Sequence, residues 1–178
     1  QDNNTIRYGL GAIKGLGRSA IELIELERSN HGPFRALADF CNRLDLQKVN
    51  RRAIDVSIRA GALDALDPAG NRARLMRELG DALLASEQLQ KDRAAGQTDM
   101  FGQMEPTLAV TPREHLPTPP WTALQSLQCE REALGLYLTG HPTHIHGQEL
   151  ARFTTCQLGE IGPRVPADTA NHRWGGVP

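Results

Sequence analysis

The stretch that decides the fold is residues 10–21, LGAIKGLGRSAI, in which two glycines flank one leucine between two apolar segments. Glycine permits backbone conformations that a Cβ atom disfavours, so residues 15–17 predict a tight turn. The apolar spacing predicts one helix before the turn, over residues 6–13, and a second helix after it, over residues 18–29. Leu16 is expected to point inward and to hold the two helices together.

The same turn carries the first predicted chemistry. It leaves the amides of Gly17, Arg18 and Ser19 at the positive end of the second helix, where a phosphate can dock. This arrangement resembles a helix-hairpin-helix element, which holds the backbone of duplex DNA without reading its sequence. We therefore predict DNA contacts from Lys14, Gly15, Leu16, Gly17 and Arg18. The alternative is a turn that only connects two helices, as Gly-x-Gly turns commonly do.

A second basic group follows, and its members are also predicted to contact DNA: Lys48, Arg51 and Arg52. We expect Asn50 to cap the helix that carries the two arginines and Gly61 to end it. Cations oppose the dipole at a helix N-terminus, so a bound anion there would stabilise them. The alternative is that these side chains cover apolar neighbours or pair with Asp45 and Asp55. Residues 59–63 are a candidate for a second, degenerate hairpin.

The composition favours helices and excludes several classes of protein. The 178 residues include 23 leucines and 20 alanines but only 5 valines and 8 isoleucines, and 4% are aromatic. A mainly α fold is therefore expected, and a β-sandwich or parallel sheet is not. No apolar run approaches the roughly 18 residues of a membrane span. Three cysteines, an odd number, suit a reducing cytosol better than a disulfide framework, so we expect a cytoplasmic protein.

The charge is uneven along the chain. The net charge of −1 is the sum of +3 over residues 1–59, −3 over residues 60–112 and −1 over residues 113–178. A slightly basic first third permits a local contact with a polyanion that the total conceals. The first residue is Gln1 rather than Met, which suggests a piece of a larger chain.

Four parts are predicted along the chain. Residues 1–93 form the helix-hairpin-helix domain, and its long last helix begins after Asn71 and carries a regular apolar stripe of Leu75, Leu79, Ala82, Leu83 and Leu89. Residues 94–120 contain five of the eleven prolines and are predicted to be a linker. Residues 121–150 are a helical segment that stops at Gly140-His141-Pro142, and residues 151–178 are irregular. The histidines 141, 144 and 146 with Cys156 lack a paired second half, so no metal site is predicted.

The linker contains the second functional motif, residues 97–101. It consists of Gln97, Thr98, Asp99, Met100 and Phe101. Two adjacent large apolar side chains beside a glutamine in a polar loop are typical of a short linear recognition element. The string resembles the sliding-clamp binding motif of bacterial replication proteins, and micromolar affinity, about −8 kcal/mol, is expected of such a segment.

Several segments in this order closely resemble the C-family of bacterial replicative polymerases, the alpha subunits of DNA polymerase III. The segments are residues 7–17, 37–41, 49–52, 59–64, 100–102 and 130–142. The resemblance implies a tandem helix-hairpin-helix region behind the polymerase active site, followed by a clamp-binding segment and the lead-in to an oligonucleotide-binding (OB) domain. It places the catalytic carboxylates and their Mg²⁺ upstream, in the palm, so no catalytic residue and no cofactor is expected in this segment.

The partners implied by the resemblance are duplex DNA, the sliding clamp (beta subunit) and other polymerase III holoenzyme subunits, in a bacterial cytoplasm at the nucleoid. The full subunit would be a DNA-directed DNA polymerase, a nucleotidyltransferase. Two alternatives are a non-catalytic adaptor that binds only protein and a DNA-repair module with tandem hairpins.

Overall fold

The computed structural model describes residues 8–94 and 117–156, and these residues contain helices and no strand. The chain divides into two compact units, residues 1–140 and 141–178. The helices of the first unit are α1 (Arg18–His31), α2 (Leu37–Arg43), α3 (Arg51–Arg59), α4 (Arg72–Ala94) and α5 (Ala123–Leu134), with 3-10 turns η1 (Leu10–Ala12) and η2 (Asp64–Leu66). The predicted mainly α fold is confirmed.

Local capping explains where several helices begin. The Asn50 side chain accepts a hydrogen bond from the Ala53 amide at 3.0 Å, as predicted for the N-cap of α3. Asn71 accepts from the Arg74 amide at 3.2 Å at the start of α4. Helix α5 begins with a capping box, in which the side chains and backbone amides of Thr122 and Gln125 bond reciprocally.

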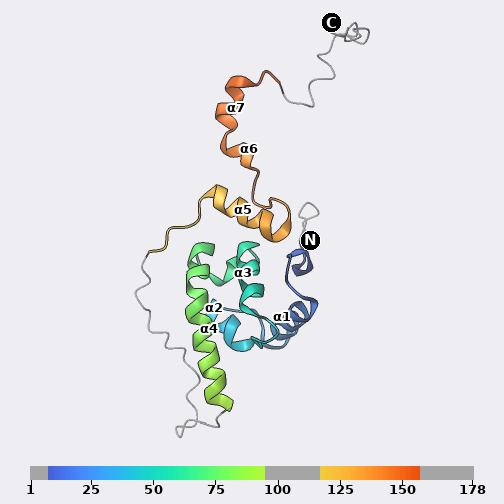
Figure 1. Cartoon of the computed structure of the whole chain (residues 1–178), viewed down its shortest axis with the longest axis vertical. Helices are drawn as coiled ribbons and strands as arrows, with labels where there is room; N and C mark the ends of the chain where they lie inside the picture. Colours follow the sequence, from blue (N-terminus) through green and yellow to red (C-terminus); the bar gives the residue numbers. More distant parts are fainter. Residues whose placement is uncertain (1–7, 95–116, 157–178) are drawn as a thin grey trace, which may run out of the picture. The chain divides into compact units, whose positions relative to one another are not determined.

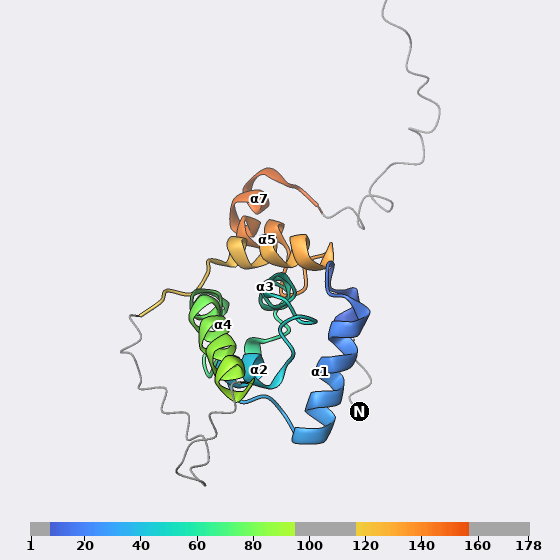
Figure 2. The same cartoon turned by 60° about the horizontal axis from the view of Figure 1, so that its bottom comes forward.

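One apolar core joins the helices of the first unit. Helix α4 lies beside α2 and α3, and α5 lies across the ends of α3 and α4 (Figures 1 and 2). The most deeply buried large apolar side chains come from α2, α3, α4 and the turn between α2 and α3: Phe40, Cys41, Leu44, Val49, Ile54, Ile58, Leu75 and Leu79. The predicted stripe of α4 therefore faces the core, because residues three and four apart share one face of a helix.

Two predicted helices differ from the structure. Within the described residues, the segment before the first turn forms only η1, because Gly9 and Gly11 each disfavour a helix by about 1 kcal/mol relative to alanine. Helix α5 stops at Leu134, although the apolar spacing continues to Leu138. Gly135 adopts a left-handed conformation with φ 83° and turns the chain away from the helix axis.

The second unit, described by itself, contains α6 (Pro142–Ile145) and α7 (Gly147–Phe153). No helix stops at Gly140-His141-Pro142 as predicted, and α6 begins there instead, because the His141 side chain caps the Thr143 amide and proline suits the first turn of a helix. Nowhere in the described parts of the chain is a helix long and apolar enough to span a membrane. The clamp motif at residues 97–101 and most of the predicted irregular tail lie outside the described residues.

Candidate nucleic-acid interface

The first hairpin, residues 13–17, has the predicted geometry. Gly15 has φ +84°, a conformation that favours glycine, and Leu16 is buried with 8% of its surface exposed. Gly17 is the N-cap of α1, and its carbonyl oxygen accepts hydrogen bonds from the amides of Ala20 and Ile21. The turn is held from inside by Leu16, as the sequence predicted.

The N-terminus of α1 presents hydrogen-bond donors. Within the described residues, the amides of Gly17, Arg18 and Ser19 donate to no protein acceptor. This is expected, since the first amides of a helix have no acceptor within it. The Arg18 side chain is 92% exposed, and its Nε lies 3.7 Å from a carboxylate oxygen of Glu22. Such an exposed pair contributes little, so the guanidinium remains available to an anion.

Lys14 is held differently from the other residues of the first hairpin. Its backbone amide donates to the Ala133 carbonyl of α5 at 2.8 Å. A Cβ atom built on Gly135 would lie 2.9 Å from the Lys14 Nζ, so the ammonium group lies against the C-terminal end of α5. A cation is favourable there because of the helix dipole. The structure thus assigns Lys14 an intramolecular contact that the sequence did not predict.

The second basic group lies on a turn that repeats the first hairpin. We call residues 44–50, between α2 and α3, the second hairpin. Val49 is buried directly before the N-cap of α3, as Leu16 is buried directly before the N-cap of α1. Three residues after each N-cap stands a buried alanine, Ala20 in α1 and Ala53 in α3. The tandem arrangement therefore consists of η1–α1 and α2–α3.

Residues 59–63 do not repeat this geometry. Gly61 has φ +79° and ends α3, as predicted. No α-helix follows it directly, because the chain first forms η2 and a turn in which the Gly70 amide donates to the Asp67 carbonyl at 2.9 Å. The candidate degenerate hairpin at these positions is therefore the end of a helix followed by a longer connection.

The second basic group is exposed, with Lys48 in the second hairpin and Arg51 and Arg52 in the first turn of α3. None of these three residues forms an ion pair with another described residue. The predicted alternative partners are engaged elsewhere. Asp55 pairs with Arg59 at 2.6 Å, and the Asp45 side chain accepts a hydrogen bond from the Gln47 amide at 2.9 Å. These three positive charges therefore stand at the N-terminus of α3 without compensation from those carboxylates.

No hydrogen bond or ion pair among the described residues joins the two hairpins. Arg59, the last residue of α3, lies 3.4 Å from a carboxylate oxygen of Glu132 in α5. The opposite end of α3, with Arg51, is roughly 12 Å away along the helix axis at a rise of about 1.5 Å per residue. The first hairpin, by contrast, contacts α5 directly through Lys14. Arg51 and Arg52 therefore stand at the end of α3 that is remote from the Arg59–Glu132 contact with α5.

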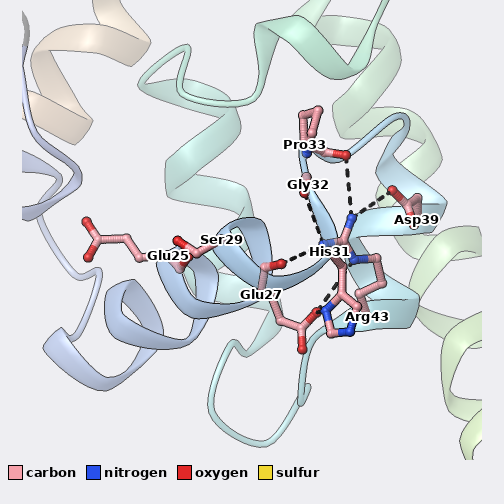
Figure 3. Close-up of polar contacts among 8 residues, drawn as sticks. All are labelled: Glu25, Glu27, Ser29, His31, Gly32, Pro33, Asp39 and Arg43. Carbon is pink, nitrogen blue, oxygen red and sulfur yellow. Dashed lines mark hydrogen bonds and ion pairs between the residues drawn. The ribbon is translucent and has the colours of Figure 1, made fainter.

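Arg43 joins the end of α1 to α2 (Figure 3). Its Nη2 donates to the carbonyls of Glu27 at 2.8 Å and Gly32 at 3.2 Å. The guanidinium also lies 4.3 Å from the centre of the Phe34 ring and 3.5 Å from a carboxylate oxygen of Asp39. This side chain holds the C-terminal end of α1 against α2, and no local sequence pattern indicates the contact.

A buried charge cluster joins α5 to the start of α4. Glu130 is fully buried, and its Oε1 lies 3.0 Å from an Arg72 guanidinium nitrogen. Its Oε2 accepts from the amides of Leu138 and Thr139 at 2.8 and 2.9 Å. Burial alone would raise the pKa of the Glu130 carboxyl, but these hydrogen bonds outweigh that effect and leave the pKa below its ordinary value.

Arg72 completes the cluster from the other side. Its guanidinium forms a two-pronged pair with Asp64, in which Nε and Nη2 each lie 2.8 Å from a carboxylate oxygen. The same guanidinium covers Gly61, where any Cβ atom would collide with it. In the sequence, Glu130 stands out only as part of the family resemblance, and no pattern singles out Arg72. No three His, Cys, Asp or Glu side chains in the described parts of the chain converge to hold a metal ion.

The first hairpin has the geometry of a helix-hairpin-helix element, and the family model described as the helix-hairpin-helix motif matches residues 1–75. Over 162 residues the chain is 45% identical to the DNA polymerase III subunit alpha of Vibrio cholerae, covering 91% of this chain and 14% of that protein. The Haemophilus influenzae and Escherichia coli K12 subunits are 44% and 45% identical over 162 and 152 residues, covering 91% and 85% of this chain and 14% and 13% of their own lengths.

The chain is therefore a homologue of one segment of the DNA polymerase III alpha subunit, and the resemblance noted in the sequence is confirmed. It spans only about one seventh of the length of these relatives (14% of the Vibrio cholerae protein).

Proposed function

We propose that this segment holds duplex DNA for a replicative DNA polymerase and tethers that polymerase to its sliding clamp. The observation that carries the DNA contact is the first hairpin, where three amides with no acceptor among the described residues and the exposed Arg18 stand at the N-terminus of α1. The similarity to a DNA polymerase subunit supports the proposed role in a polymerase. As the resemblance implies, we propose that the nucleotidyl-transfer reaction and its Mg²⁺ belong to parts of the polymerase outside this segment.

The proposed DNA contact is electrostatic and independent of sequence. Phosphate oxygens accept hydrogen bonds from the α1 amides, and the helix dipole and Arg18 supply positive potential at the same place. The second basic group offers another phosphate contact through Arg51 and Arg52, which lie at the end of α3 remote from α5. Each phosphate contact releases counterions. A plot of the logarithm of the binding constant against the logarithm of the salt concentration therefore falls with a slope of about 0.9 per contact.

Binding of the chain to fluorescent duplexes of unrelated sequence, titrated with salt, tests this proposal. Arg18→Ala should weaken binding equally for all duplexes and lower the salt slope by about 1. Arg28→Ala is the matched control, because it removes an exposed arginine from the other end of α1. Equal effects of the two substitutions, or an effect restricted to one sequence, would contradict the proposed hairpin contact. Absence of any duplex binding would favour the protein-only adaptor.

The proposed clamp contact rests on residues 97–101. A clamp that encircles DNA keeps a tethered polymerase at a high effective concentration after each release. Replacing Gln97, Met100 and Phe101 together by alanine should abolish binding to the clamp and leave duplex binding unchanged. Replacing Gln103 and Met104 together by alanine is the matched control, because it removes a glutamine and a methionine from the same segment. Unchanged clamp affinity in the triple variant, measured by surface plasmon resonance, would refute the assignment.

A further inference from the structure

Helix α5 holds the first hairpin by its backbone. The Lys14 amide, in the middle of the turn, donates to the Ala133 carbonyl at 2.8 Å, and Ala133 is itself buried. Gly135, which ends α5, leaves the space that the Lys14 ammonium group occupies. The position of the first hairpin is therefore linked to the position of the last turn of α5.

The buried charge cluster in turn determines where α5 lies. Glu130 is one helical turn before Leu134, and it is the residue through which α5 bonds to Arg72 at the start of α4. The Arg72 side chain is only 11% exposed and is held on its other side by Asp64. A buried charge that loses its partner is strongly unfavourable, so this pair resists any displacement of α5.

The polar contacts that α5 makes with Arg59 of α3 are weaker. Arg59 of α3 lies 3.4 Å from Glu132, whose side chain is 68% exposed. Solvent screens such a pair, so it contributes little to the placement of α5. Glu130 and Glu132 therefore provide a matched comparison on one helix, because the first forms a buried ion pair and the second an exposed one.

We propose that Arg72 and Glu130 are positioning residues for DNA binding: they seat α5 so that its Ala133 carbonyl holds the first hairpin in the conformation that binds phosphate. This inference rests on the proposed DNA contact. A turn that is already ordered loses less conformational freedom on binding, so seating α5 raises affinity without touching DNA. By linkage, bound DNA also strengthens the contact between the first hairpin and α5.

The test uses the full 178-residue chain and the substitution Glu130→Gln. Glutamine keeps the shape and an oxygen that accepts from the loop amides, but it removes the charge that faces Arg72. Glu130→Gln should accelerate hydrogen exchange at the Lys14 amide at least tenfold and weaken duplex binding severalfold. The Val49 amide of the second hairpin, which donates to the Asp45 carbonyl, should exchange as before. Glu132→Gln is the matched control and should change neither quantity.

A double-mutant comparison separates positioning from general destabilisation. If Glu130 acts through the first hairpin, Glu130→Gln should weaken binding much less in an Arg18→Ala background than in the wild type. In an Arg51→Ala background, its effect should keep its full size. If Glu130→Gln abolishes the helical circular dichroism, Arg72→Lys takes its place, because it retains the positive charge and removes the two-pronged pair.

The outcomes are distinct. Faster exchange at Lys14 with unchanged DNA affinity, or effects that are additive with Arg18→Ala, would overturn the positioning role and leave the proposed DNA contact standing. A wild-type chain that binds no duplex would refute the proposed function itself, and the positioning role with it.

Discussion

Gly61→Ala is expected to destabilise the first unit more than the same change at any open glycine turn. Gly61 has φ +79°, so the left-handed backbone alone costs an alanine about 1 kcal/mol. The new Cβ would also lie against the Arg72 guanidinium, 2.7 Å from its Cζ, and 3.1 Å from an Asp64 oxygen. Arg72 would have to move, and each charged hydrogen bond it loses contributes about 1.5–3 kcal/mol. The expected total is about 3–5 kcal/mol.

Gly15→Ala is the matched control for this prediction. Gly15 has φ +84°, but a Cβ atom there has nothing within 4 Å, so only the backbone cost of about 1 kcal/mol applies. Urea unfolding followed by circular dichroism measures both variants, and the slope m checks that the denatured state is unchanged. With m of about 1–3 kcal/mol per molar urea, the midpoint of Gly61→Ala should lie at least ~0.5 M below that of Gly15→Ala. Equal midpoints would refute the collision with Arg72.

Three further predictions follow from the buried groups and caps. Because the folded pKa of Glu130 is lowered, its contribution to stability is complete above the ordinary glutamate pKa and is lost as the pH falls through the lowered value. Urea midpoints should therefore drop between about pH 5 and pH 3 by more in the wild type than in Glu130→Gln. Burial raises the pKa of the Cys41 thiol to about 11, so iodoacetamide at neutral pH should modify Cys129 well before Cys41, and Cys41 only on unfolding. Asn50→Ala removes the N-cap of α3 and should cost about 1 kcal/mol, whereas Asn50→Asp should preserve most of the stability; equal losses would show that the cap bond to Ala53 contributes nothing.

The two hairpins illustrate how far local patterns reach. The sequence predicts the first hairpin correctly because its signal is local. A left-handed glycine, a buried leucine and an N-cap follow one another at Gly15, Leu16 and Gly17. The second hairpin has no glycine pair, and the sequence pattern instead favours a degenerate hairpin at residues 59–63. Only the burial of Val49 and the packing of α2 beside α4 reveal it at residues 44–50.

The sequence by itself determined the helical fold, most helix boundaries and the geometry of the first hairpin, because capping residues and apolar spacing act within one or two turns of the chain. Tertiary structure alone decided that Lys14 binds the end of α5 and that Glu130 pairs with Arg72. These partners lie far apart in sequence, 58 positions in the case of the ion pair. A buried charge needs a partner wherever the fold supplies one, and no local pattern states which residue that will be.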